Sequence, residues 1–237
     1  MRTLGIAVVV VAALTAAGRA PQVGGTISGK VRFTGTKPVM TKIDMSDEAV
    51  CKNKYTTPPT EEAVVVNPNG TLANVFVYVK AGLPAGYAAP APAGAVVLDQ
   101  NGCRYHPHVF GMVAGQTLSI KNSDGILHNI KALGKKNRPF NVSEPTTMTM
   151  DRPRAFPVPE VMVSLECNVH GWMHAYVGVL PHAFFAVTGA DGSFSIKGLP
   201  AGTYTIEAWH EKYGTQVATV TVTAAGAKTQ DFTFTGR

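Results

Sequence analysis

Short hydrophobic runs rich in β-branched and aromatic residues occur along most of the chain, and Gly, Pro, Asn and Asp separate them at close intervals. Apolar and polar positions alternate in several of these runs, a pattern typical of β-strands bounded by turns. The clearest runs are 26–33, 75–79, 117–120, 161–165, 194–196, 204–209 and 217–222. A helical period is weak throughout, and residues 45–52 are the best candidate for a helix. The sequence therefore predicts an all-β protein.

Two stretches of biased composition interrupt this pattern. Residues 82–94 are rich in Ala, Pro and Gly and predict a linker. Residues 135–154 are polar and contain Pro, and we expect a long loop there.

The N-terminus has the layout of a secretory signal peptide. Arg2 precedes an apolar run at 4–17, and small residues at 18–20 offer a cleavage site, which predicts a signal peptide over 1–20. The apolar run is shorter than the roughly 20 residues that span a bilayer, although an uncleaved anchor is the alternative. We expect a periplasmic or otherwise exported protein with no membrane span after cleavage.

Charge argues against a nucleic-acid partner. The chain has 21 Lys and Arg against 15 Asp and Glu, a formal charge of +6, and losing Arg2 and Arg19 with the signal peptide would leave +4. The basic residues are scattered, whereas a nucleic-acid binder clusters them. We interpret the excess of basic residues as a contribution to solubility, or as a weak electrostatic attraction that steers the protein toward an acidic partner.

The chain has three cysteines, Cys51, Cys103 and Cys167. Disulfides form in an oxidising compartment, so an odd number of cysteines needs an explanation. We expect Cys167 to be a metal thiolate and Cys51 to pair with Cys103. The alternative makes Cys103 a second metal thiolate beside His106 and His108.

The strongest chemical signal is a thiolate, an imidazole and a thioether close together after an apolar strand, at Cys167, His170 and Met173. Soft sulfur ligands together with imidazole favour copper, and a blue-copper site has two His, one Cys and a weak axial Met. The second His must come from another strand, where His128 is the candidate. A buried free thiol and a zinc site are the alternatives, but structural zinc sites lack Met.

This pattern resembles the cupredoxin family. An Asn-x-x-x-x-x-His-Asn run ending at Asn129, followed downstream by Cys-x-x-His-x-x-Met, is similar to it over about 94–181, with a ligand loop spaced as in amicyanin rather than plastocyanin. The resemblance implies that the ligands of one mononuclear type 1 copper are His128, Cys167, His170 and Met173. It also implies that Asn129 and Asn168 tie the two ligand segments together and orient the ligands.

A second resemblance lies at 189–204, where Asp191-Gly192 forms a tight turn and Pro200 and Gly202 shape another. This segment closely resembles the carboxypeptidase regulatory-like family, which are small transthyretin-like β-sandwiches. The family's opening Gly-x-Val strand occurs instead at 25–33, and its next strand at 72–80. The copper domain is therefore expected to be inserted into this sandwich; the alternative is two domains in sequence.

The predicted organisation is a signal peptide (1–20), N-terminal strands belonging to the regulatory-like sandwich (21–93), a cupredoxin-like copper domain (94–182) and the rest of the regulatory-like sandwich (183–237). The fold class is all-β, a cupredoxin Greek-key β-sandwich plus a smaller transthyretin-like β-sandwich.

Other histidines give weaker signals. His106 and His108 lie on a probable strand, where both side chains would point the same way, and we expect a packed or surface pair. His174 is expected to face solvent, and His182 and His210 to be polar side chains near a domain junction.

The predicted function is one-electron transfer by a periplasmic type 1 copper protein that is not an enzyme. The cupredoxin resemblance implies a redox partner such as a c-type cytochrome, a dehydrogenase or an oxidase. The alternatives are a copper-binding or delivery protein without electron transfer, and a cell-envelope interaction module in which the regulatory-like sandwich binds the partner.

Overall fold

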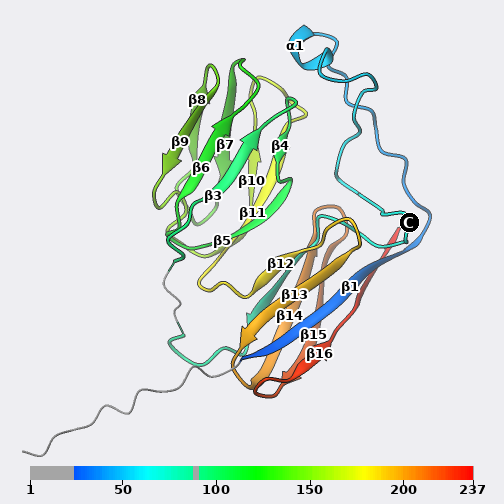
Figure 1. Cartoon of the computed structure of the whole chain (residues 1–237), viewed down its shortest axis with the longest axis vertical. Coiled ribbons are helices and arrows are strands. Elements are labelled where there is room, and N and C mark those ends of the chain that lie inside the picture. Colours follow the sequence, from blue (N-terminus) through cyan, green and yellow to red (C-terminus); the bar gives the residue numbers. More distant parts are fainter. Residues whose placement is uncertain (1–23, 88–90, 237) are drawn as a thin grey trace, which may run out of the picture.

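The structure is a computed structural model that describes residues 24–87 and 91–236. It confirms the all-β prediction, with four sheets stacked in two β-sandwiches (Figure 1). The helix expected over 45–52 is a single turn, α1 (Ala49–Lys52). The predicted signal peptide lies outside the described residues. Within the described part of the chain, no helix is long and apolar enough to cross a membrane.

The first sandwich holds the predicted copper ligands. One of its sheets has the order β5-β11-β10-β7-β8, and the other has the order β4-β3-β6-β9. The first sheet consists of β5 (Val109–Val113), β11 (His174–Leu180), β10 (Glu160–Glu166), β7 (His128–Leu133) and β8 (Phe140–Glu144). The second consists of β4 (Tyr105–His106), β3 (Val96–Gln100), β6 (Leu118–Asn122) and β9 (Met148–Arg152).

Alternating apolar positions of both sheets meet in one core. Leu98 and Ile120 from one sheet and Ile130, Leu165 and Val177 from the other are fully buried in the same cluster. Because successive side chains of a strand point to opposite faces, this alternation fixes which face of each strand is inward. The pairing of β7 with β10 then brings the first residue of β7, His128, to the sheet end where β10 leads into the Cys167 loop.

The prediction of a long loop at 135–154 is wrong, because the strands β8 and β9 occupy half of this stretch. Their exposed positions are polar, as is normal for antiparallel strands with one face in water. Phe140 supplies the apolar contact, since its ring packs against Phe156 at 5.7 Å between centroids and lies 4.3 Å from the Arg152 guanidinium.

The second sandwich combines strands from both ends of the chain. One sheet has the order β13-β1-β16, with β17 also paired to β1, and the other has the order β12-β2-β14-β15. The first consists of β1 (Gly25–Gly35), β13 (Ser193–Leu199), β16 (Ala227–Thr229) and β17 (Phe232–Gly236). The second consists of β2 (Phe76–Ala81), β12 (Phe185–Val187), β14 (Gly202–His210) and β15 (Gly214–Val222). The strands β1 and β2 therefore complete a sandwich whose other strands follow residue 182. The domain limits at 93 and 182 stay a prediction.

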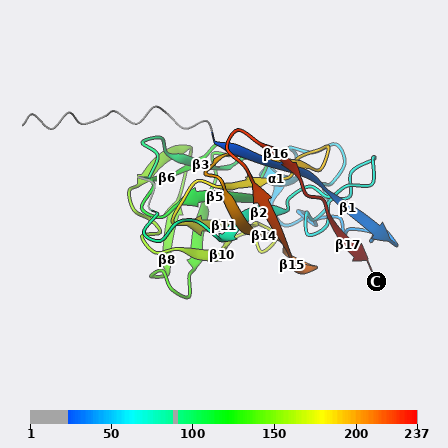
Figure 2. The same ribbon diagram turned by 90° about the horizontal axis from the view of Figure 1, so that it is seen from below.

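The two sandwiches meet along an apolar junction. Phe76, Tyr78, Val109 and Leu180 form a buried cluster of their own. Viewed from below, β5 and β11 of the first sandwich lie beside β2 and β14 of the second (Figure 2).

The segment between β1 and β2, residues 36–75, is here called the strap. It runs from the end of β1 to α1 and back to the second sandwich (Figure 1). Ile43, Met45 and Cys51 of the strap belong to the core cluster of the first sandwich. The strap therefore covers the first sandwich although it is connected on both sides to the second.

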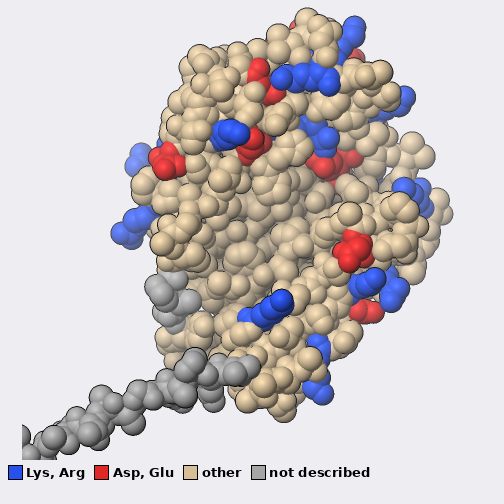
Figure 3. Space-filling view, viewed as in Figure 1, with Lys and Arg blue, Asp and Glu red and all other residues tan. Residues whose placement is uncertain are grey.

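Charged residues are spread over the visible face of the molecule with both signs interspersed (Figure 3). This is the scattered distribution that the sequence predicts.

Candidate metal centre

The loop between β10 and β11, residues 167–173, carries three of the four predicted ligands. Its two ends are joined by a hydrogen bond from the Cys167 amide to the Met173 carbonyl, at 3.1 Å. Inside the loop, the Met173 amide donates to the His170 carbonyl at 2.9 Å. These bonds close the loop into a compact turn and hold the three side chains at one end of the sandwich.

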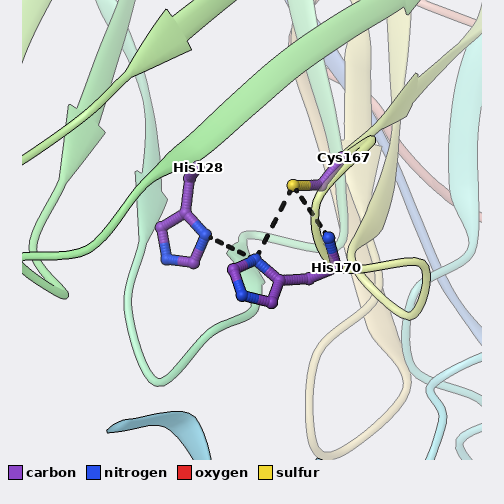
Figure 4. Close-up of side chains that lie close together, drawn as sticks. All are labelled: His128, Cys167 and His170. Atoms are coloured by element: carbon purple, nitrogen blue, oxygen red, sulfur yellow. Dashed lines mark hydrogen bonds between the residues drawn. The ribbon is translucent and has the colours of Figure 1, made fainter. Parts of the chain in front are cut away.

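His128, Cys167 and His170 converge in the core (Figure 4). Their ligand atoms all lie within 4.8 Å of one another. The two Nδ1 atoms face each other at 2.9 Å, and Cys167 Sγ lies 3.8 Å from His170 Nδ1. The structure thus brings together two imidazole nitrogens and one sulfur from two strands and a loop.

A buried carboxylate sets the tautomer of His128. His128 Nε2 lies 2.9 Å from Asp124 Oδ2, and a carboxylate accepts hydrogen bonds, so Nε2 carries the proton. In the neutral ring the lone pair is then on Nδ1, which faces the site, whereas the protonated ring donates from Nδ1 to Cys167. Metal-binding His commonly uses its second nitrogen in this way, and the contact fixes the ring orientation.

Hydrogen-bond donors around Asp124 stabilise its negative charge. Burial by itself would raise its pKa, but hydrogen bonds from His128, Lys54 and the backbone amides of Cys103 and Gly102 lower the pKa to about 2. Lys54 Nζ lies 3.0 Å from Asp124 Oδ1. The carboxylate is therefore ionised across the physiological range.

The surroundings of Cys167 stabilise its thiolate form. Burial would raise the pKa of its thiol, but hydrogen bonds from His128 and His170, with further bonds from Asn129 and the His170 backbone, lower the pKa to about 5. Only the thiolate binds metals, so the sulfur is in its ligand form at neutral pH. Burial would lower the pKa of His128, but its hydrogen bonds to Asp124 and Cys167 raise it.

Asn129 ties the first ligand strand to the ligand loop. Its Oδ1 accepts from the Asn168 backbone amide at 2.7 Å and lies 3.4 Å from Cys167 Sγ. Its Nδ2 donates to Asn141 Oδ1 at 2.8 Å. Asn168 takes part through its backbone amide, and its side chain is exposed.

Met173 is 2% exposed and packs in the core cluster of the first sandwich. Between it and His170 lies Trp172, whose indole N–H donates to the Cys103 carbonyl at 2.9 Å. The ligand loop is therefore anchored to the segment that carries the disulfide.

Cys51 and Cys103 form a disulfide, with Cα atoms 5.6 Å apart. Cys51 Sγ lies 3.8 Å from His170 Nε2, so the disulfide covers the outer edge of this imidazole. His170 is only 3% exposed.

Two expectations for the other histidines are wrong. His106 ends β4 and is exposed, while His108 lies beyond the strand and is buried, so the pair shares no face. His174 does not face open solvent, because it is half-buried with its ring 5.3 Å from that of His108.

Part of the chain matches a known family. Residues 157–235 match the carboxypeptidase regulatory-like domain. This confirms the resemblance of the C-terminal segment, although the match begins earlier, in the stretch that contains β10 and β11 of the first sandwich. No curated protein matches the chain.

The solved structures similar to part of the chain include, by their titles, a Cu-containing reductase, a purple cupredoxin and a Cu(I) amicyanin. The Cu-containing nitrite reductase of Thermus scotoductus SA-01 is 18% identical over 42% of this chain and 25% of its own, with a TM-score of 0.33. A purple cupredoxin from Nitrosopumilus maritimus is 19% identical over a match that covers 35% of this chain and 97% of the cupredoxin, with a TM-score of 0.30. A Cu(I) amicyanin mutant is 16% identical over a match that covers 44% of this chain and 97% of the amicyanin, with a TM-score of 0.32. The chain thus spans a quarter of the reductase and nearly all of each small protein.

The donor set fits a soft or borderline metal ion. A thiolate and two imidazoles suit copper and zinc alike, and the thioether of Met173 in the same loop favours copper. Asp124 was not found from the sequence. Its position four residues before His128 in a Gly-containing turn is a signal, but Asp is common in turns, so this position alone does not identify it.

Proposed function

We propose that the protein is a type 1 copper protein that carries single electrons between redox partners outside the cytoplasm. The observation that carries the proposal is the convergence of His128 Nδ1, His170 Nδ1 and Cys167 Sγ within 4.8 Å in a buried site whose loop also supplies Met173. Copper would supply the change of oxidation state.

The chain's own residues would keep the ligands still while the charge of the site changes. Asp124 fixes the His128 ring, Asn129 fixes the ligand loop, and the loop closes on itself through backbone hydrogen bonds. A site held in this way suits electron transfer, because little has to move when an electron arrives or leaves.

The disulfide supports an exported location, since disulfides persist in oxidising compartments and are rare in the cytosol. The partner we propose is a redox protein such as a c-type cytochrome, a dehydrogenase or an oxidase. Among the described residues we propose no catalytic group, and we assign the protein a carrier role.

The test is an optical and EPR spectrum of the copper-loaded full chain. We expect an intense visible band from sulfur-to-copper charge transfer, and we expect Cys167→Ala to abolish it. The matched control is Cys51→Ala with Cys103→Ala, which removes the other two cysteine sulfurs and should keep the band. A colourless Cu(II) protein, or a Cys167→Ala variant with the full band, would refute the assignment.

A further inference from the structure

A second cluster of metal-binding side chains lies at the junction of the two sandwiches. It consists of His108, just before β5, His174, at the start of β11, and Glu211, in the turn between β14 and β15. Their ligand atoms all lie within 4.8 Å of one another. Two of the residues come from the first sandwich and one from the second.

Both ring nitrogens of His108 face acceptor atoms. His108 Nδ1 lies 3.1 Å from the His174 carbonyl, which can only accept, so Nδ1 carries a proton. His108 Nε2 faces Glu211 Oε2 at 2.5 Å, a hydrogen-bond distance that needs a proton between the two atoms. A divalent ion in place of that proton would bind the Nε2 lone pair and the carboxylate oxygen together.

The surroundings make a cation favourable. The side chains of His108 and Glu211 are 3% and 10% exposed, so their polar atoms are largely withdrawn from water. Glu62 Oε2 lies 4.0 Å from His108 Nδ1 and adds negative charge, although Arg104 pairs with this carboxylate. A cavity of about 10 Å³ borders His108 and His174, which is room for about one water molecule.

We propose that His108, His174 and Glu211 form a second metal site for a divalent ion of the zinc class, separate from the thiolate centre. Two imidazoles and one carboxylate, with a water in the remaining position, are a known ligand set for Zn²⁺. Ligand atoms around tetrahedral zinc lie roughly 3.3 Å apart, given bonds of about 2.0–2.1 Å. The separation of His108 Nε2 and Glu211 Oε2 is shorter than this value, and all ligand atoms of the cluster lie within 4.8 Å of one another, so modest side-chain movements would complete the site.

The ion would join the two sandwiches. His174 follows Met173 directly, so the site also adjoins the ligand loop of the thiolate centre. An ion that binds the folded junction and not the unfolded chain raises the thermal stability of the whole molecule.

The experiment measures Zn²⁺ binding to the full-length, disulfide-bonded protein by equilibrium dialysis, together with the melting temperature. Glu211→Gln keeps the size and the hydrogen-bonding capacity of the side chain but removes the charge, and His174→Ala removes one imidazole. We expect each to lose one zinc per chain and the zinc-dependent rise in melting temperature. His106→Ala, an exposed histidine two residues from His108, is the matched control and should bind as the parent does.

A Cys167→Ala variant separates this site from the thiolate centre, and it should still bind the zinc that Glu211→Gln loses. The proposal is overturned if Glu211→Gln and His174→Ala bind as much zinc as the parent, or if Cys167→Ala binds none. Neither result depends on the visible spectrum, so the test of the proposed function and the test of this second site can fail independently of each other.

Discussion

At the scale of single residues, His128 and Cys167 are each held by a partner that is not itself a ligand. Asp124 holds His128, and Asn129 holds the start of the ligand loop. Met173 is different, since its contacts are its backbone bonds within the loop and the apolar packing around its side chain. Its thioether is therefore the ligand whose replacement disturbs the rest of the site least.

Met173→Leu should leave copper bound and raise the reduction potential, because loss of the thioether destabilises Cu(II) more than Cu(I). Met173→Gln should lower the potential, because an amide oxygen favours Cu(II). We expect shifts on the order of 59 mV, which corresponds to a tenfold change in relative affinity for a one-electron couple. Spectroelectrochemical titration measures them. Met150→Leu, on the outer strand β9, is the control. Complete loss of copper in either Met173 variant would make this residue a strong ligand and favour a copper carrier.

Glu144 is a buried carboxyl group in the strand next to His128. It is fully buried in β8 and pairs with His128 across the ladder. Gln100 Nε2 donates to its Oε2 at 3.1 Å, but among the described residues Glu144 Oε1 has no partner. Burial, with the nearby Cys167 charge, raises its pKa to about 7. The folded protein therefore keeps a proton on Glu144 that the unfolded chain loses near pH 4.5.

Since the folded state binds this proton more tightly, its contribution to stability is complete below about pH 4.5 and is lost as the pH rises through 7. In the metal-free protein, Glu144→Gln should remove this part of the pH dependence. We expect the difference in unfolding free energy between parent and variant to change by roughly 2–3 kcal/mol between pH 4.5 and 8, at about 1.4 kcal/mol per pKa unit. Urea titrations measure it, and Glu61→Gln is the control. A constant difference would show that Glu144 is ionised when folded.

The ligand types could be predicted from the sequence because the chemistry is local. Cys167, His170 and Met173 fall within one short loop, and the spacing alone indicates a soft-metal site. His174, Glu211 and Glu144 could not be assigned, because their roles depend on which strands pair and on which residues of the other sandwich lie opposite. His174 was expected in solvent, but it is half-buried and its ligand atom lies within 4.8 Å of that of Glu211 in the β14–β15 turn.

At the scale of elements, the strap is the part whose position the sequence does not indicate. Its hydrophobic pattern is weak, and it is held on the first sandwich by Cys51–Cys103, by Lys54–Asp124 and by the Tyr55 hydroxyl donating to the Gly102 carbonyl at 2.7 Å. The strands β8 and β9, which pair with β7 and β6 in the two facing sheets, were expected to be a loop for a similar reason, since polar residues dominate their exposed faces.

Replacing Cys51 and Cys103 together by Ala should loosen the strap and uncover His170. The bond joins residues 52 apart in sequence, and the chain-entropy model gives about 4 kcal/mol for a loop of that size. We expect a loss of that order in unfolding free energy and faster removal of copper by a chelator, because His170 Nε2 loses its cover. Val39→Ser, at a position 95% exposed on the same strap, should change neither quantity. An unchanged extraction rate would show that the strap does not shield the metal.

At the scale of the whole molecule, the two sandwiches are joined by covalent connections on both sides of the first and by a packed junction. Glycines on β5 and β11 allow the close approach. A Cβ atom on Gly178 would collide with the Phe76 ring, and one on Gly111 would lie 2.7 Å from it. Tyr176 and Trp209 also meet across the junction, with ring centroids 5.1 Å apart. The pairings of β1 and β2 with the C-terminal strands build the second sandwich from separated pieces of the sequence.

Phe76 is the residue on which the junction depends most, since it is fully buried and fits against glycines of the facing sheet. Phe76→Ala removes that contact, and such a truncation costs about 3–5 kcal/mol in a packed core. We expect the parent to unfold in a single calorimetric transition and Phe76→Ala to unfold in two, because in the variant the sandwiches keep their own cores but lose their coupling. The visible spectrum should persist, since the thiolate centre lies inside the first sandwich. Phe33→Ala is the control, because Phe33 packs on the core of the second sandwich and not on the junction; it should lower the melting temperature while leaving one transition. A single transition in Phe76→Ala would mean that the covalent connections and the strap, rather than the junction, couple the two halves.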